Sequence, residues 1–444
     1  MTRRALVLLV LLAACLTGLA LTGRTIFLSL SILFAGVLTV ARLWSWSALR
    51  GLRLERSSRS LTSQVGRVFE ETLSLRNDSV FPKLWVEVRD ESDLPGSWAA
   101  ARAIGLRFDA SSSAFRGHRA SAVAASLGAH QSWLWTARTI CTRRGRFRLG
   151  PATLIAGDPF GLFPGRRNVG DPREVVVLPP AVPLPSFPIP AGRLSGGEAL
   201  RRRTYQITPN AAAVREYAHG DSLSRIHWKS SARRGRLISK EFELDPMSDI
   251  WLVVDGHRRM HFRQSGDDEL LAGATGGRQW RLPADTEEYM IAAAASVALH
   301  VLAQNRAAGL LGYGATRMVV QPERGEAQLF RLLEALAGFQ AVGEVDLAEV
   351  FRLETKWFPR GATVVVLTPN TRDDLRMELL EMRRRGLSPV AVLIEPEDFG
   401  SRQATGPLAA ALAASGIAAR VVRRGRALED SLGGPKGGRL RDVA

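Results

Sequence analysis

The sequence predicts a multidomain protein that joins a transmembrane helical hairpin, an all-β sandwich and a doubly wound α/β domain. Two nearly uninterrupted apolar runs lie at residues 5–21 and 25–41, and each is about the minimum length for a helix that spans a bilayer. Short pieces of alternating apolar and polar residues follow over residues 52–182, as in half-buried strands. From residue 248 onward, wholly apolar strands alternate with helices, as in a parallel sheet that is covered on both faces. The 444 residues leave room for about three domains of roughly 150 residues each.

The transmembrane hairpin is predicted over residues 1–49, with its turn at Gly23 and Arg24. Arg24 is the only charged residue between the two apolar runs. The flanks, in contrast, are basic, with Arg3, Arg4, Arg42, Arg50, Arg53, Arg56 and Arg59. The positive-inside rule therefore places both ends of the hairpin, and the domains after it, in the cytoplasm of a multi-pass cell-membrane protein. An alternative is that residues 12–15 are a lipobox and that Cys15 becomes a lipidated, exported N-terminus. The second apolar run begins soon after Cys15 and favours the hairpin.

Residues 52–182 are predicted to form an antiparallel β-sandwich of the immunoglobulin-like kind. The period of two expected of strands is found in RVFEETLSLRN, PKLWVEVRD, SWLWTARTI and RGRFRLGPATL. We interpret Trp85, Trp133 and Trp135 as core or rim packing, because they lie in regularly alternating strands. Residues 109–129, which are rich in Ser, Ala, Gly and Arg, are predicted to be a long loop.

A stiff, extended linker is predicted over residues 183–203. The proline-rich string PPAVPLPSFPIP at residues 179–190 contains six prolines and overlaps the first part of the linker. The linker ends in basic residues. A proline-rich docking ligand is the alternative for this segment.

The signature segment, residues 204–247, holds the densest run of charges, aromatic residues and turn residues in the chain. We expect a helix that starts with Asp221 or Ser222 as its N-cap, continues to about Arg233 and ends at Gly235, followed by a strand over residues 237–242. Four charged residues on this helix are four apart and form one stripe: Asp221, Arg225, Lys229 and Arg233.

The string REYAHGDSLSRIHWKSSAR lies at residues 215–233. It resembles the signature of the DUF58 family, domain of unknown function 58, at Arg215, Glu216, Tyr217, Gly220, Asp221, Arg225, Ile226, His227, Trp228, Lys229, Ala232 and Arg233. GDPFGLF at residues 157–163 and VVVLPP at residues 175–180 extend the resemblance. It implies a membrane-anchored protein with a von Willebrand factor A-like region, encoded beside MoxR-type AAA ATPases and transglutaminase-like proteins.

The α/β domain is predicted over residues 248–426, and a disordered tail over residues 427–444. Strands are expected at residues 250–255, 309–314, 363–368 and 389–394, and helices at residues 287–305, 327–339, 347–358, 373–385 and 406–415. This order, with TVVVLTP before a helix, is similar to the von Willebrand factor A fold that the family resemblance implies.

A von Willebrand factor A fold often carries a metal site, and the residues here argue against one. The site needs Asp-x-Ser-x-Ser after the first strand, because these side chains supply oxygen ligands to Mg²⁺. Asp255 is present, but His257 and Arg259 occupy the two serine positions, and no acid directly follows Thr368. We therefore predict no metal and no other cofactor, and we interpret Asp255 as a strand-end residue or a helix cap.

Two other functions compete with an interaction role. A hydrolase could use Asp221, His227 and either Ser230 or Ser231, but Asp221 and His227 would lie on different sides of one helix. A nucleic-acid-binding protein could use the net charge of +17 and the clustered Arg143, Arg144, Arg201, Arg202, Arg203, Arg233 and Arg234. No helix-turn-helix, zinc-finger or aromatic RNA-binding signature accompanies these arginines, and basic clusters beside a membrane more often meet anionic lipid.

The sequence therefore predicts a membrane-anchored, cytoplasmic, non-enzymatic interaction or scaffold protein. By the family resemblance, it would work with a MoxR-type AAA ATPase, and with a transglutaminase-like protein as a further partner, in assembly or maturation of envelope or enzyme complexes. The residues expected to bind a partner or to hold the structure are Arg215, Glu216, Tyr217, Gly220, Asp221, Arg225, His227, Trp228, Lys229 and Arg233. On the signature helix, the cations either pair with acids of the adjoining domains, which we favour, or form an exposed docking surface.

Overall fold

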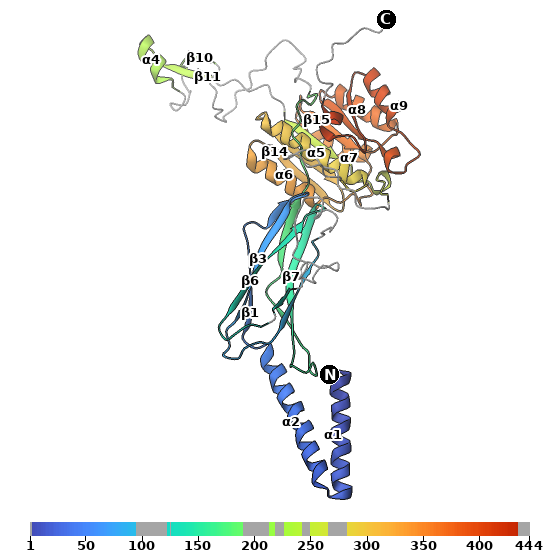
Figure 1. Ribbon diagram of the computed structural model, residues 1–444. Coiled ribbons are helices and arrows are strands. Elements are labelled where there is room, and N and C mark those ends of the chain that lie inside the picture. The colour runs from blue at the N-terminus through green and yellow to red at the C-terminus, as the bar shows by residue number, and fades with distance from the viewer. Residues whose placement is uncertain are drawn as a thin grey trace. The chain divides into compact units, whose positions relative to one another are not determined.

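The computed structural model describes residues 2–94, 122–124, 126–189, 213–217, 226–241, 249–264 and 282–433. The chain divides into two compact units (Figure 1). The first consists of Met1–Val182, Gln264–Ala295 and Leu333–Phe339, and the second of Pro183–Arg263, Ser296–Leu332 and Gln340–Ala444. Each unit therefore combines segments that are far apart in the sequence.

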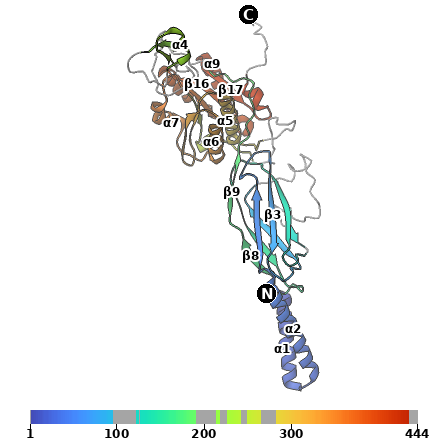
Figure 2. The same ribbon diagram turned by 90° about the vertical axis from the view of Figure 1, so that its left-hand side faces the viewer.

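Two apolar helices open the first unit, α1 (Arg3–Thr22) and α2 (Thr25–Ala48), and both are long and apolar enough to cross a membrane. Gly23 joins them with a φ of 63°, a left-handed conformation that glycine adopts without strain. Figure 2 shows both helices leaving the same end of the β-strands of this unit. α2 continues past the apolar run, which ends at residue 41, and stops within the predicted hairpin of residues 1–49, because Trp44 and Ala48 pack against the core of the strands.

The β-strands of the first unit form two sheets that face each other. One sheet has the order β1-β3-β6, from β1 (Leu52–Ser58), β3 (Val68–Asn77) and β6 (Ser132–Ile140). The other has the order β2-β9-β7-β4-β5, with β8 paired to β7, from β2 (Thr62–Gln64), β9 (Arg173–Leu178), β7 (Gly145–Ala156), β4 (Val86–Ser92), β5 (Ala122–Ala124) and β8 (Gly165–Val169). Leu54 and Leu75 of the first sheet share one core with Val88 and Leu154 of the second.

Two details of these sheets correct the prediction. β2 pairs with β9 in parallel, so the sandwich is not wholly antiparallel. β5 and a bridge between Lys83 and Leu127 lie within the predicted loop, because a run of three small residues is too short to show a period. The earlier part of that loop lies outside the described residues. Trp133 and Trp135 stack with ring centroids 4.6 Å apart and pack against the core, as predicted.

A six-stranded sheet with the order β14-β13-β12-β15-β16-β17 forms the centre of the second unit. The parallel strands are β12 (Ile250–Val254), β13 (Ala308–Tyr313), β15 (Thr363–Thr368), β16 (Ser388–Ile394) and β17 (Ala418–Val422), and β14 (Arg317–Glu323) is antiparallel to β13. The helices that follow strands are α5 (Thr286–Ala303), α6 (Glu326–Gly338), α7 (Leu347–Glu354), α8 (Asp374–Arg384) and α9 (Gly406–Ala414), with 3₁₀ turns η2 (Arg258–Met260), η3 (Thr355–Trp357) and η4 (Pro396–Phe399). Side chains of α7, α8 and α9 share one core with those of the strands.

Two segments are packed where the sequence predicted a linker and a disordered tail. Residues 183–189 are extended, as expected, but Phe187 is buried and its ring meets the ring of His300 edge-on, with centroids 6.4 Å apart. The prediction of a linker was based on the proline content, and it did not take account of the apolar side chains that lie among the prolines. A short helix, α10 (Leu428–Leu432), stands at the start of the predicted tail, because Leu428 and Leu432 are one turn apart and both are buried. The rest of the linker and of the tail lies outside the described residues.

Candidate functional site

The described part of the signature segment folds as a small hairpin that carries a helix. β10 (Ala213–Glu216) pairs antiparallel with β11 (Ile238–Glu241), and α4 (Trp228–Arg234) comes between them in the chain. Residues 213–217 and 226–241 are named the signature hairpin. The helix begins at Trp228 and not near residue 222, because Ile226 forms a β-bridge and His227 is the N-cap. It ends at Gly235 with a φ of 64°, as predicted.

His227 and Ser231 hold this hairpin together. The Nδ1 atom of His227 accepts the N–H of Ser230 at 3.1 Å, and the N–H of His227 donates to the carbonyl of Ile238 at 2.8 Å. The hydroxyl of Ser231 donates to the carbonyl of His227 at 3.1 Å and accepts the N–H of Ile238 at 2.9 Å. Both side chains therefore satisfy local backbone groups, and the hydrolase alternative gains no support from them.

The surface of α4 presents a large apolar group among cations. The side chain of Trp228 is 67% exposed, and Lys229, Arg233 and Arg234 are exposed as well. Within the part of the chain that the structure describes, neither Lys229 nor Arg233 has an ion-pair partner, and their pairing with acids of the adjoining domains stays a prediction. Gly220, Asp221 and Arg225 lie outside the described residues, and Arg215, Glu216 and Tyr217 lie on β10 or directly after it.

A second candidate site lies at the carboxyl edge of the six-stranded sheet. β13 is on one side of β12 and β15 is on the other, so the strand order reverses between β12 and β15. Open α/β sheets bind ligands outside the carboxyl ends of their strands at such a reversal. Asp255 directly follows β12 and Thr368 ends β15, and the hydroxyl of Thr368 donates to Oδ2 of Asp255 at 2.6 Å. The two strand ends are thereby tied to each other.

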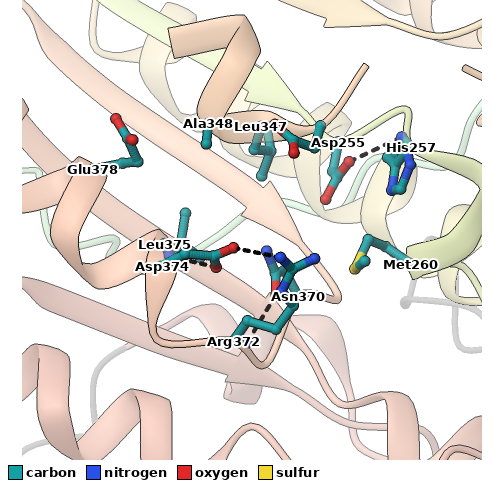
Figure 3. A pocket seen from close by; sticks show the side chains of 11 residues that line it. Asp255, His257, Met260, Leu347, Ala348, Asn370, Arg372, Asp374, Leu375 and Glu378 are labelled. Atoms are coloured by element: carbon teal, nitrogen blue, oxygen red, sulfur yellow. Dashed lines mark hydrogen bonds and ion pairs between the residues drawn. The ribbon is translucent and has the colours of Figure 1, made fainter. Parts of the chain in front are cut away.

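A hollow of about 330 Å³, counting the part open to solvent, lies beside these strand ends (Figure 3). Its charged and titratable lining is Asp255, His257, Asp346, Arg372, Asp374 and Glu378. Arg372 pairs with Asp374 at 3.0 Å, and Asp346 caps α7 by accepting the N–H of Glu349 at 2.8 Å. Burial raises the pKa of Glu378. The wall is therefore rich in carboxylates, and several of them are already engaged.

Asp255 itself is buried, and both of its carboxylate oxygens accept hydrogen bonds from the protein. Oδ1 accepts the N–H of His257 at 3.0 Å, and Oδ2 accepts the hydroxyl of Thr368. Among the described residues, no group of three His, Cys, Asp or Glu side chains is placed to hold a metal ion. Asp255 thus orders the chain at the ends of two strands, the structural role expected of it, and the prediction that no metal binds stays a prediction.

Two glycines bring the backbone segments at this edge into close contact. A Cβ atom on Gly256 would lie 1.9 Å from the carbonyl oxygen of Tyr313, and one on Gly343 would lie 2.5 Å from the same oxygen. Gly343 donates its N–H to the carbonyl of Gly256 at 2.9 Å, and its own carbonyl accepts the N–H of Arg258 at 2.9 Å. Sequence reasoning missed both positions, because a single glycine after an apolar strand has no period that marks it.

One arginine that the nucleic-acid alternative would use is buried inside the first unit. The side chain of Arg144 is 3% exposed, and it pairs with Glu288 and, at 2.6 Å, with Glu287. It also donates to the carbonyls of Leu336 and Phe339, at 3.1 and 2.9 Å. Arg144 is therefore part of a core and cannot reach a nucleic acid.

Residues 213–399 match the family model described as Protein of unknown function DUF58. This part of the chain is similar to the DUF58 family. The match begins at the start of the signature hairpin and ends at η4, so the matched region includes both candidate sites. Uncharacterized protein YeaD of Bacillus subtilis (strain 168) is 26% identical over 218 residues, which are 49% of this chain and 48% of YeaD. The chain thus spans about half the length of this curated relative.

Two solved structures are each similar to 29% of the chain. The CARDB domain of the PF1109 protein from Pyrococcus furiosus is 14% identical with a TM-score of 0.20, over 29% of this chain and 87% of that chain. The C-terminal domain of wzt is 12% identical with a TM-score of 0.18, over 29% and 73%. TM-scores this low support no inference about the fold or the function of the chain.

Proposed function

We propose that the protein is a membrane-anchored interaction protein, with its folded domains in the cytoplasm, whose signature hairpin docks onto a MoxR-type AAA ATPase. The observation that carries the proposal is α4, where Trp228 and three cations are exposed together on one short helix. The family resemblance supplies the ATPase as partner, a transglutaminase-like protein as a further one, and assembly or maturation of envelope or enzyme complexes as the process. We propose that the protein acts without catalysis of its own.

The chemistry of α4 suits a protein partner that has an apolar pocket rimmed by carboxylates. A tryptophan buries about 150–250 Å² when it is covered, and Trp and Arg are the residue types most enriched among binding hot spots. Lys229, Arg233 and Arg234 supply positive charge, which favours an acidic surface. The hydrogen bonds of His227 and Ser231 hold α4 in place before binding, so little conformational freedom is lost on docking.

Binding of the purified full-length chain to the purified MoxR-type ATPase of the same organism tests the docking surface. Trp228→Ala should weaken binding by about 30-fold, the effect of losing a hot-spot residue worth about 2 kcal/mol. Trp357→Ala is the matched control, because Trp357 is 69% exposed but lies on η3, and it should leave binding unchanged. Equal binding by wild type and the Trp228→Ala variant would refute the docking surface, and absence of any binding to the ATPase would refute the partner.

Membrane topology is tested separately, with reporter fusions at Ala444 and after Gly23. We expect a cytoplasmic reporter at Ala444 and an external one after Gly23, because arginines flank α1 and α2 and only Arg24 lies between them. An exported C-terminus, or a lipid on Cys15, would contradict this topology.

We also propose finer fold assignments for the two units. The sandwich of the first unit would be immunoglobulin-like, since a three-stranded and a larger sheet enclose its core. The six-stranded sheet of the second unit would be von Willebrand factor A-like, since one antiparallel edge strand joins five parallel strands with helices between them. An experimental structure compared with members of both folds is the test of each assignment.

A further inference from the structure

We propose that the end of the β-sandwich next to α1 and α2 is a lipid-binding surface that rests on anionic phospholipid headgroups. The inference rests on the membrane anchor proposed above. This surface, named the sandwich base, consists of the loops at residues 78–84 and 157–163, the first residues of β8, and the ends of α1 and α2 nearest to them.

The first argument is the length of α1 and the place where it is attached. The hydroxyl of Thr2, the N-cap of α1, donates to the carbonyl of Leu162 at 3.0 Å, and Ala5 is buried in one cluster with Leu162. The 20 residues of α1 rise by about 30 Å, which equals the hydrocarbon thickness of a bilayer. Because α1 is only as long as the hydrocarbon layer is thick, its first residue lies at the boundary between that layer and the headgroups. The loop that holds Thr2 must therefore lie in the headgroup layer.

The end of α2 fixes the other loop at the same level. Lys83 donates from Nζ to the carbonyl of Ser47 at 2.6 Å, and the N–H of Asp78 donates to the carbonyl of Gly51 at 2.7 Å. The loop at residues 78–84 is therefore held beside the last turn of α2. It carries Val80 and Phe81, and both side chains are more than half exposed, as is Phe160 in the other loop. Exposed apolar side chains at loop tips beside a membrane anchor are placed to enter the interface of the bilayer.

Charge at the sandwich base is strongly positive. Exposed arginines surround the apolar tips: Arg3, Arg4, Arg42, Arg50, Arg53, Arg76, Arg166 and Arg167. Of the acids in these loops, Asp78 pairs with Arg53 and Arg76, at 2.8 and 2.7 Å. Asp158 is buried and uses its carboxylate to accept the N–H groups of Phe160, Leu162 and Phe163. Apart from Arg53 and Arg76, these arginines therefore have no ion pair with a carboxylate of the two loops, and anionic lipid headgroups are the complementary ligand.

Aromatic residues complete the pattern of a membrane interface. Trp46 is exposed near the end of α2, and the guanidinium carbon of Arg50 lies 3.3 Å from the centroid of its ring. Tryptophan and arginine side chains of this kind collect at the level of the headgroups. Because the surface continues directly from the proposed anchor, a membrane, and not a soluble protein, is the partner that always lies against it.

Fluorescence quenching in nanodiscs tests the contact. The full-length chain carries Cys15→Ala and Cys141→Ala, and a single new cysteine is labelled with an environment-sensitive fluorophore. Phe81→Cys and Phe160→Cys report on the sandwich base, and Ser60→Cys is the control, since it is exposed beyond the far end of β1. The nanodiscs contain phosphatidylcholine alone or with phosphatidylglycerol, plus a lipid with a spin label near its headgroup.

Quenching at positions 81 and 160, but not at 60, is the expected result, and it should be stronger with phosphatidylglycerol. The double variant Arg166→Glu, Arg167→Glu should weaken quenching at position 160 several-fold in anionic discs, whereas Arg59→Glu, Arg67→Glu, the same charge change at the far end, should not. If positions 81 and 160 are no more quenched than 60 while the protein stays in the discs, the lipid-binding surface is wrong and the anchor stands. If the protein does not stay in the discs, the anchor fails too. Equal quenching in neutral and anionic discs would refute the role of the arginines.

Discussion

Replacing Arg144 by methionine should destabilise the first unit by about 3 to 5 kcal/mol, the cost of removing one partner from a buried ion pair. The side chain of Arg144 is 3% exposed, and it neutralises Glu287 and Glu288, whose side chains are 20% and 17% exposed. Methionine keeps the packing of the stem but leaves two carboxylates without their cation. It also leaves the carbonyls of Leu336 and Phe339 without the N–H groups that Arg144 donates.

Arg146→Met is the matched control, because Arg146 lies two residues farther along β7 and its side chain is 54% exposed. Its pairs with Glu174 and Glu334 are on the surface, where such pairs contribute about 0 to 1 kcal/mol. Urea unfolding of both full-length variants in detergent, followed by tryptophan fluorescence, measures the two losses through their midpoints and slopes.

The pH dependence of the same variant gives a second test of the reasoning. Burial raises the pKa of Glu288, and Arg144 acts against that rise. Without Arg144 the pKa of Glu288 should rise further, so the folded variant takes up a proton and its stability deficit shrinks as the pH falls. A loss for Arg144→Met as small as that for Arg146→Met, or a deficit that grows as the pH falls, would refute the buried pair as a source of stability.

Three further predictions concern the second unit. Glu354 accepts hydrogen bonds from Arg317 and Tyr313, and the bond from Arg317 lowers the pKa of Glu354. The Glu354→Gln variant should therefore be less stable than wild type at neutral pH. This difference in stability should shrink as the pH falls below 4.5, the ordinary pKa of this carboxyl. Thermal unfolding across the pH range measures this difference, and a constant value would contradict it. Calorimetry with Mg²⁺, Mn²⁺ and Ca²⁺ should show no specific binding, and micromolar affinity that disappears in Asp255→Ala would overturn the prediction that no metal binds. Gly256→Ala should lower the unfolding midpoint strongly, because its Cβ would lie 1.9 Å from the carbonyl oxygen of Tyr313, whereas Gly406→Ala, with no atom within 4 Å, should be tolerated.

Buried strands were the elements that the sequence predicted best. TVVVLT was expected at residues 363–368, and β15 has those bounds, because every one of its residues is buried and none needed to be polar. β14 and β17 were missed for the opposite reason. They are the two edge strands of the sheet, most of their side chains are partly exposed, and no continuous apolar run marks them.

The candidate sites were less predictable than the sheet, because they depend on contacts between distant residues. The spacing of four from Asp221 to Arg233 indicated one continuous helix, but the backbone of His227 bonds to Ile238 and the helix starts only afterwards. The basic character of Arg144 indicated a surface residue, while its partners lie more than a hundred residues farther along the chain. Local pattern carries no information about such partners.

The short turn between α1 and α2 has a consequence for how the protein is made. Gly23 and Arg24 alone separate the two helices, so in the proposed anchor α1 could not cross the bilayer independently of α2. For the proposed anchor, the hairpin must enter the membrane as one piece and carry Arg24 across the hydrocarbon layer, where an arginine is unfavourable. The apolar residues of both helices together repay that cost. Insertion should therefore wait until α2 has emerged, so that the targeting signal is the pair of helices and not α1 alone.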